Sequence, residues 1–455
     1  MKGVGHPFAA LSVGSRGVGK RKTLAETRCL GRVEMNRQFS RCISGALSLC
    51  VMLACEASSR DVGFVVRDSA GITIVENVQA LWTESEGWRI APEPELVIGA
   101  DASNPNEQLY VVSQVVLLDT AIIIANNGTS ELRVFDRRGN FLRSIGGNGN
   151  GPGEFNGLRS LYSCVNDTLV ANELRRLSLF NGHGEFVRTI PLIPELLPRP
   201  GVVRGVSSDC TAVVVDQAVP TEPSMTEPYA QQMLLLWIPL DGTGRQTIAQ
   251  VDGPDVLQVA AGDRLVTQRL PWGRLPDYAL SDRRLYVGDS DTSEIRVYTT
   301  SGLERVIRWT APRKPVTDRD RDLFREEQAA EIRADGGGLA QLLPSLDDYP
   351  HVAGQKPVYS RLIVDDVGNL WVREYPDVIG WDPTGRDVDR DGAPENWWVF
   401  DADGRLLESV VVPATLRVLS VQDDYLIAIA FDENDVEQLS LYRIEGRESG
   451  ESSAR

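Results

Sequence analysis

From residue 95 onward, short runs of alternating apolar and polar residues recur along the chain, separated by glycine, aspartate and asparagine. The segment IIIANNGTSELRVFDRRGNFLRSIG, residues 122–146, shows the pattern, since its apolar runs are rich in β-branched residues and end at turn residues. Such alternation is typical of β-strands with one buried face, and the turn residues between the runs predict hairpins. We therefore expect this part of the chain to consist of antiparallel sheets.

The pattern of a strand, a short turn and a second strand repeats. It recurs in six segments, which are residues 122–146, 169–190, 210–251, 285–309, 370–412 and 425–444. Repetition of short strands with glycine-rich turns is the sequence signature of propeller blades. We predict an all-β fold, a six-bladed β-propeller of four-stranded blades. The last copy has only three obvious strands, so we expect ELVIGA, residues 95–100, to supply the fourth and leave no exposed edge.

A resemblance to a known family supports this prediction. The motif RVFDRRGNFLRSIG, residues 133–146, resembles the NHL-type repeat, and the GNGPGEF after it is similar to bacterial six-bladed propeller proteins of the secreted or lipoprotein type. The segment RDSAGITIVEN, residues 67–77, resembles the stretch that precedes the propeller in those proteins. The resemblance covers most of residues 65–445 and implies a propeller fold. It implies little about function, because propellers host many activities.

The glycines between residues 146 and 153 raise the alternative of a phosphate-binding loop. Such a loop needs a fixed glycine spacing and a following helix whose N–H groups face the anion. Here Pro152 and Glu154 occupy positions where a G-x-G-x-x-G motif needs glycine, and residues 158–172 alternate as a strand does. We interpret the glycines as a turn between blades, where positive φ is needed.

Residues 35–55, MNRQFSRCISGALSLCVMLAC, have the pattern of a signal peptide, with Arg37 and Arg41 before a short apolar stretch. That stretch is too short to span a bilayer as a helix. The ending MLAC resembles the lipobox of bacterial lipoproteins, in which the cysteine, here Cys55, is lipidated; an ordinary secretory peptide is the alternative. We expect an extracytoplasmic protein, anchored at the outer membrane or secreted, and we expect residues 1–34 to be untranslated.

The remaining boundaries follow from the same patterns. We expect a lead-in at residues 56–94, the propeller at 95–445 and a polar C-terminal tail at 446–455. An insertion at 311–357, between blades 4 and 5, contains TDRDRDLFREEQAAEIRA, which predicts a helix with Thr317 as its N-cap. Its weak apolar stripe favours a helix packed on the ring over a mobile lid.

Charge and cysteine content narrow the function classes. Asp and Glu total 64 against 47 Lys and Arg, a net charge of −17. Residues 1–55, which we call the leader, hold nine of the basic residues. So acidic a body repels phosphate backbones, which argues against nucleic-acid binding. We expect a monomer that touches a membrane only through its lipid anchor. Outside the leader only Cys164 and Cys210 remain, and they form either a disulfide or two buried thiols.

The long insertions all fall in two loop classes, those between second and third strands and those between blades. These loops share one face of a propeller, which we call the loop-rich face, and they comprise residues 221–230, 252–276, 311–357 and 375–395. The other face keeps tight turns. Because loops on a rigid scaffold commonly carry function, we expect binding on the loop-rich face.

The stretch DVDRDGAPE is the most specific candidate for a metal site. Its acidic residues occupy positions 1, 3, 5 and 9, with glycine at position 6, and are Asp387, Asp389, Asp391 and Glu395. This spacing can surround a hard cation with oxygen ligands, and it resembles the calcium loops of integrin-type propellers. A solvated acidic loop is the alternative. Calcium is the only cofactor that the sequence suggests.

A second candidate is a ring of polar residues at the ends of the second strands. These ring positions are Asn126, Asn172, Asp216, Asp289, Glu374 and Asp432. Converging at the channel mouth, such side chains can hold calcium, as in the lactonases of similar architecture that the arrangement resembles. Short polar side chains also cap turns at such positions, which is the alternative interpretation.

A catalytic histidine has one candidate. His351 lies in an insertion of the loop-rich face, beside Asp347 and Asp348, and can serve as a base there. An ordinary loop histidine is the alternative, since no serine elbow, Cys-His pair or zinc motif accompanies it. We therefore favour a binding module that recognises a small molecule or protein. A calcium-dependent hydrolase or lyase and a structural scaffold of the cell envelope are the alternatives.

Overall fold

The computed structural model describes residues 63–447, with several gaps. The residues left out of the description within this range are 84–85, 102, 174, 193–196, 198, 200, 222–223, 225–226, 262–263, 335–345, 347–351 and 377–392. By its internal contacts the chain separates into Met1–Ser58 and Ser59–Arg455, and every described residue belongs to the second unit. The leader, with Cys55, therefore lies outside the described residues.

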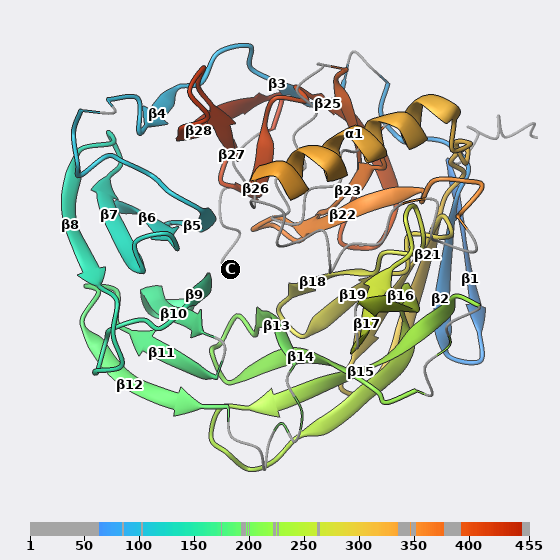
Figure 1. The fold of residues 1–455 in the computed structure, drawn as a ribbon, viewed down its shortest axis with the longest axis horizontal. Coiled ribbons are helices and arrows are strands. Elements are labelled where there is room, and N and C mark those ends of the chain that lie inside the picture. Colours follow the sequence, from blue (N-terminus) through green and yellow to red (C-terminus); the bar gives the residue numbers. More distant parts are fainter. Residues whose placement is uncertain are drawn as a thin grey trace, which may run out of the picture. The chain divides into compact units, whose positions relative to one another are not determined.

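The described strands form six sheets, which we call blades 1 to 6 in chain order (Figure 1). Blade 1 comprises β5 (Val112–Leu117), β6 (Ala121–Asn126), β7 (Glu131–Asp136) and β8 (Phe141–Gly146). Blade 2 comprises β9 (Leu158–Cys164), β10 (Thr168–Glu173), β11 (Arg176–Phe180) and β12 (Phe186–Pro191). Blade 3 comprises β13 (Val202–Val206), β14 (Ala212–Ala218), β15 (Tyr229–Pro239), β16 (Gln246–Ala261) and β17 (Arg264–Arg269).

The other three blades complete the set. Blade 4 comprises β18 (Asp277–Ser281), β19 (Arg284–Gly288), β20 (Glu294–Thr299) and β21 (Gly302–Arg308), joined by β1 (Phe64–Ser69) and β2 (Ile72–Asn77). Blade 5 comprises β22 (Tyr359–Val364), β23 (Leu370–Glu374), β24 (Glu395–Phe400) and β25 (Leu406–Val412). Blade 6 comprises β26 (Arg417–Gln422), β27 (Tyr425–Phe431) and β28 (Glu437–Glu445), joined by β3 (Arg89–Ile90) and β4 (Leu96–Ile98).

The blades are arranged in a closed circle. The first strand of each blade contacts the first strand of the next, from β5 through β9, β13, β18, β22 and β26 back to β5. Each blade therefore packs its faces against two neighbours, as Figure 1 shows. The expected all-β propeller architecture agrees with this arrangement.

Strand β4 closes blade 6 as the sequence predicts. It pairs antiparallel with β28, with Ile98 opposite Leu439 and Leu96 opposite Leu441. The N-terminal part of the propeller thus covers the backbone of its C-terminal strand, which removes an exposed edge.

The number of strands differs from the prediction in half of the blades. Blades 1, 2 and 5 have four strands, whereas blades 3 and 6 have five and blade 4 has six. In blade 4 the extra strands come from residues that we expected to be a lead-in, since β2 pairs parallel with β21 and places Thr73 opposite Arg305. In blade 3 the extra strand is β17. Strand β16 extends beyond the residues that pair with β15, and β17 pairs with this extension.

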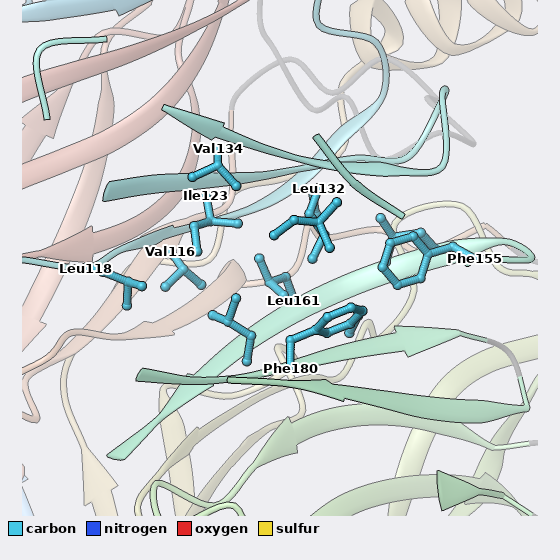
Figure 2. Close-up of a cluster of buried hydrophobic side chains, with 13 residues drawn as sticks. Val116, Leu118, Ile123, Leu132, Val134, Phe155, Leu161 and Phe180 are labelled. Atoms are coloured by element: carbon cyan, nitrogen blue, oxygen red, sulfur yellow. The ribbon is translucent and has the colours of Figure 1, made fainter. Parts of the chain in front are cut away.

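The glycine-rich segment between residues 146 and 157 is the connection from β8 to β9, as expected. Gly146 and Gly153 have φ angles of 85° and 77°, which side chains rarely adopt. A Cβ on Gly146 would lie 2.2 Å from the Phe155 ring. Phe155 itself is fully buried in the cluster between blades 1 and 2, beside Phe180 and Leu132 (Figure 2). The turn is therefore shaped to insert an aromatic ring between two blades.

Helix α1 (Asp318–Ala334) lies between blades 4 and 5 in chain order, and Thr317 caps it. The Asp320 N–H donates to Thr317 Oγ1 (3.2 Å) and the Thr317 N–H donates to Asp320 Oδ2 (2.7 Å), a reciprocal capping box. Phe324 is buried against Trp272, with ring centroids 5.4 Å apart, and against Tyr375. These contacts favour the packed helix over a lid. No helix in the described part of the chain is long and apolar enough to cross a membrane.

Candidate functional site

A pocket of about 430 Å³ lies where blades 2, 3 and 4 meet. Its lining includes Asn172 near the end of β10, Val202 at the start of β13, Asp216 near the end of β14 and Arg269 at the end of β17. In a propeller blade, the first strand begins and the second ends at the same face, and both inter-blade loops and second-to-third loops lie there. The pocket therefore belongs to the loop-rich face, where binding was expected.

The extended hairpin of blade 3 builds one wall of this pocket. Strand β16 places Val256 opposite Tyr229 of β15 and opposite Arg269 of β17. The apolar part of the lining consists mainly of Val202, Val203, Ala218, Met233, Pro254, Val256, Leu275 and Pro276. A pocket with an apolar wall and a few charged groups has the composition that small-molecule sites commonly have.

Arg204 is a charged residue of the pocket whose partner also lines the pocket. Its Nη2 lies 2.8 Å from Asp216 Oδ2, and its guanidinium lies 4.9 Å from the centroid of the Tyr278 ring. Burial opposes the charge on Arg204, but the Asp216 carboxylate more than compensates and raises the pKa of the guanidinium. Asp216, only 2% exposed, thus neutralises one positive charge of the pocket.

Two further arginines of the pocket have no such partner. No hydrogen bond or ion pair joins the side chain of Arg159 or Arg269 to any residue in the described ranges. Both side chains remain accessible to water, yet partial loss of hydration and the nearby charge of Arg204 lower the pKa of Arg269. The pocket therefore carries two uncompensated positive charges on a chain whose net charge is −17.

The end of β10 contributes two buried polar residues to the pocket. Glu173, 2% exposed, accepts a hydrogen bond from the Asn156 N–H (2.7 Å) and pairs with Arg176 (2.8 Å). Asn172, 3% exposed, donates from Nδ2 to Ser160 Oγ (3.0 Å), and its Oδ1 has no hydrogen-bond partner among the described residues. The Glu173 carboxylate therefore has hydrogen-bond partners, whereas Asn172 Oδ1 is an acceptor without one in the described part of the chain.

The six ring positions have different surroundings. Only Asn172 and Asp216 line the pocket. The others are held locally: Asn126 accepts from the Tyr110 N–H (2.7 Å), Asp289 from Asp291 N (3.0 Å), Asp432 from Asn434 N (2.8 Å), and Glu374 pairs with Lys314 (3.0 Å). Within the part of the chain that the structure describes, no group of three His, Cys, Asp or Glu residues can hold a metal ion.

The reason lies in the register of the strands. Asn126 and Asp216 both stand opposite the first residue of the preceding strand, whereas Asp289 and Asp432 follow the ends of β19 and β27 and cap turns. Positions that look equivalent in sequence thus lie at different depths. The interpretation as turn caps holds for Asp289 and Asp432, and the calcium-dependent hydrolase gains no support from the described residues.

Most of the proposed calcium loop cannot be compared with the structure. Asp387, Asp389 and Asp391 lie outside the described residues, as does His351. Glu395 is described, and its role needs correction. It is 6% exposed and forms a bidentate pair with Arg373, in which the Arg373 Nε lies 2.7 Å from Glu395 Oε2. Because β24 begins at this residue and turns it inward, its carboxylate binds a guanidinium inside blade 5.

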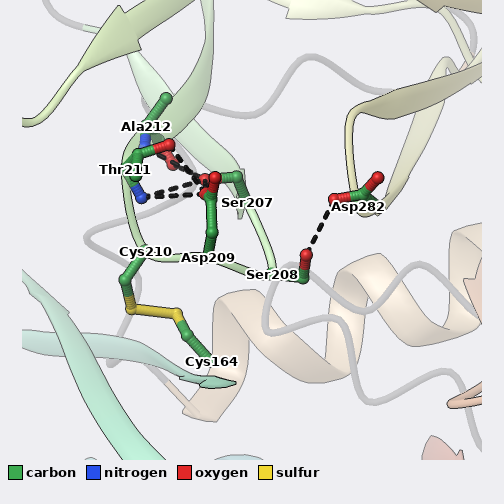
Figure 3. The surroundings of a disulfide bond; sticks show 8 residues. All are labelled: Cys164, Ser207, Ser208, Asp209, Cys210, Thr211, Ala212 and Asp282. Carbon is green, nitrogen blue, oxygen red and sulfur yellow. Dashed lines mark hydrogen bonds between the residues drawn. A yellow bond between two sulfur atoms is a disulfide. The ribbon is translucent and has the colours of Figure 1, made fainter. Parts of the chain in front are cut away.

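Cys164 and Cys210 are joined by a disulfide (Figure 3), with Cα atoms 5.6 Å apart. The bridge links the end of β9 in blade 2 to the turn before β14 in blade 3. Beside it, Asp209 accepts from Ser207 Oγ (2.6 Å) and Thr211 Oγ1 (2.7 Å), and these bonds lower the pKa of its carboxyl group. The disulfide therefore ties together two of the three blades that share the pocket, at the face opposite the pocket.

Sequence reasoning missed the three pocket arginines. Arg159, Arg204 and Arg269 come from different strands, and no motif links them. The one available signal was that residues 252–276 form an insertion of the loop-rich face, and Arg269 lies in it. Arginine supplies nearly all the positive charge of the chain. Because arginines are common throughout the sequence, the three that line the pocket cannot be distinguished from the others by residue type.

Comparison with known proteins supports the fold. Residues 105–163 match a family model described as a 6-bladed β-propeller. No curated protein matches the chain.

Solved structures resemble the chain at low sequence identity. A Bacteroides vulgatus member of the DUF4221 family is 12% identical, with a TM-score of 0.46 over 80% of this chain and 99% of its own. A Bacteroides fragilis protein described as exported is 12% identical, with a TM-score of 0.43 over 82% and 99%. A gluconolactonase from Xanthomonas campestris is 13% identical, with a TM-score of 0.33 over 78% and 97%. None of these similarities assigns an activity to this chain.

Proposed function

We propose that this chain is a β-propeller binding module that captures a small anionic ligand in the pocket between blades 2, 3 and 4. The observation that carries the proposal is that Arg159 and Arg269 line this pocket without any acidic partner among the described residues. Arg204, the third arginine, is already neutralised by Asp216.

The chemistry of the guanidinium group supports an anion as the ligand. Arginine binds carboxylates and phosphates through two parallel hydrogen bonds, and these charge-assisted bonds are stronger than neutral ones. A pocket with apolar walls strengthens them further, because fewer water molecules compete. The net charge of −17 repels anions at long range, so the pocket selects its ligand by local contact rather than by long-range attraction.

An extracytoplasmic location fits the same proposal. Residues 35–55 have the pattern of a signal peptide that ends at Cys55, the proposed lipidation site. The Cys164–Cys210 disulfide adds a second argument, because such bonds persist in oxidising compartments outside the cytoplasm. A lipid-anchored or secreted protein meets ligands in the periplasm or at the cell surface.

The proposal predicts that anions stabilise the protein through the two unpaired arginines. In a thermal-shift screen of carboxylates, phosphate and sulfate, we expect at least one anion to raise the melting temperature of residues 56–455. The variant Arg159→Ala/Arg269→Ala should bind that anion at least about 100-fold more weakly, since hydrogen bonds to charged groups contribute about 1.5–3 kcal/mol each and both guanidinium groups are removed. Isothermal titration calorimetry measures the loss.

Arg188→Ala is the matched control, because Arg188 is an exposed arginine on the outer strand of blade 2, away from the pocket. It should bind the anion as the unmodified protein does. The proposal is refuted if no anion shifts the melting temperature, or if the double variant and Arg188→Ala respond alike.

The acidic stretch with Asp387, Asp389 and Asp391 remains a proposed structural calcium site on the strength of its spacing. Calcium at a hundredfold excess over its dissociation constant should stabilise the protein by about 2.7 kcal/mol, and EDTA should reverse the effect. Asp389→Ala should abolish the calcium response, whereas Asp119→Ala, on an exposed turn, should keep it. A melting temperature that is the same in calcium and in EDTA would exclude the site.

A further inference from the structure

A chain of hydrogen bonds runs behind the pocket wall and fixes the orientation of Asn172. Asn172 Nδ2 lies 3.0 Å from Ser160 Oγ, Ser160 Oγ lies 3.2 Å from the Tyr162 hydroxyl, and that hydroxyl lies 3.4 Å from the Val203 carbonyl oxygen. All four residues lie on β9, β10 or β13, the strands at the junction of blades 2 and 3.

The direction of this chain follows from its last member. A carbonyl oxygen only accepts hydrogen bonds, so Tyr162 must donate its single hydroxyl proton to Val203. Tyr162 therefore accepts from Ser160, and Ser160 in turn accepts from Asn172 Nδ2. Burial raises the pKa of Tyr162, which keeps that proton in place. Asn172 thus keeps Oδ1, an acceptor, as its unused atom, and this atom is buried without a partner among the residues that the structure describes.

A buried acceptor without a partner is unusual, since most buried polar side chains are hydrogen-bonded. Asn172 is a lining residue of the pocket, so a donor on a ligand that reaches its amide would satisfy Oδ1. A cationic donor such as an ammonium group is disfavoured, because Arg159 and Arg269 already leave the pocket with positive charge. A neutral hydroxyl group meets both requirements.

We infer that the ligand is a hydroxylated carboxylate whose acid group binds the unpaired arginines and whose hydroxyl group donates to Asn172 Oδ1. This inference rests on the proposed function, because it assigns the hydroxyl within the same pocket. Asn172 is then the residue that determines specificity, and Tyr162 and Ser160 are positioning residues that hold its amide. The apolar wall accommodates the carbon skeleton of the ligand.

Calorimetry with matched carboxylates tests the inference. The probes are two pairs that differ by one hydroxyl group, malate with succinate and mandelate with phenylacetate. The unmodified protein should bind the hydroxylated member of at least one pair about tenfold more tightly, because the partner without the hydroxyl leaves a buried acceptor unsatisfied. Asn172→Leu, of similar volume, should lose this preference and still bind the member without the hydroxyl.

Tyr162→Phe provides a second variant outside the pocket lining. Without the tyrosine hydroxyl, Ser160 is free to donate to Asn172, and the amide can turn its NH₂ group toward the ligand. The preference for the hydroxylated probe should therefore fall in this variant, while binding of succinate or phenylacetate stays unchanged.

The outcomes separate the two proposals. Equal binding within each pair by the unmodified protein would overturn the inference and leave an anion site in place. A preference that survives both Asn172→Leu and Tyr162→Phe would overturn it as well. Failure of all four probes to bind would overturn the hydroxylated-carboxylate inference, and failure of phosphate and sulfate in addition would refute the anion-binding function.

Discussion

Replacing Glu395 with alanine is expected to lower the free energy of unfolding by about 3–5 kcal/mol, because it breaks a buried ion pair by removing one partner. The Glu395 and Arg373 side chains are only 4% and 6% exposed, so water cannot take the place of the lost carboxylate. Urea denaturation followed by tryptophan fluorescence measures the effect. The result bears on function too, since a stability loss that is the same in calcium and in EDTA assigns Glu395 to the core of blade 5.

Two control variants define what this result means. Glu304→Ala removes the partner of Arg284 from a pair whose side chains are 31% and 46% exposed, and should cost under about 1 kcal/mol. Arg373→Met/Glu395→Leu replaces both charges with apolar groups and should retain most of the stability. A loss for Glu395→Ala no larger than that for Glu304→Ala would contradict the buried-pair interpretation.

Phe155→Ala is expected to cost about 3–5 kcal/mol, the usual range for removing a fully buried aromatic ring. Phe155 is 0% exposed, and its ring centroid lies 5.8 Å from that of Phe180 in the core between blades 1 and 2 (Figure 2). Because the glycine-rich turn holds this ring in place, the variant also tests whether the turn serves packing. Thermal and urea denaturation measure the change.

Leu142→Ala serves as the comparison, since Leu142 belongs to the adjacent strand β8 but is 51% exposed. Its replacement should change stability by no more than about 0.5 kcal/mol. If the two variants were equally stable, the turn would not anchor the interface, and the phosphate-loop alternative for these glycines would need to be tested with nucleotides.

Much of the fold could be predicted from local patterns. The alternation of apolar and polar residues places strands because a pleated strand turns successive side chains to opposite faces. The strand at residues 95–100 followed from counting the strands of the last repeat, and the Thr317 cap followed from the residue types at a helix start. Such features depend on neighbours in sequence or on a repeat, so the sequence contains the signal for them.

Other features depend on contacts between distant segments. The β1–β2 hairpin joins blade 4 through a pairing between residues more than 200 positions apart. This pairing has no local signature. The ring positions differ in their surroundings for a related reason, since one residue of register moves a side chain to another face or depth.

The amino-acid sequence determined the repeating sheets, the glycine turns and the acidic character of this protein, because each is set by residue type and spacing along the chain. Only the tertiary structure decided which polar residues meet. It brought Arg159, Arg204 and Arg269 from three strands into one pocket, neutralised one of them with Asp216, and left Asn172 Oδ1 without a partner among the described residues. Charge compensation depends on which side chains lie within a few ångströms of one another in the folded chain, and no spacing along the chain encodes those distances.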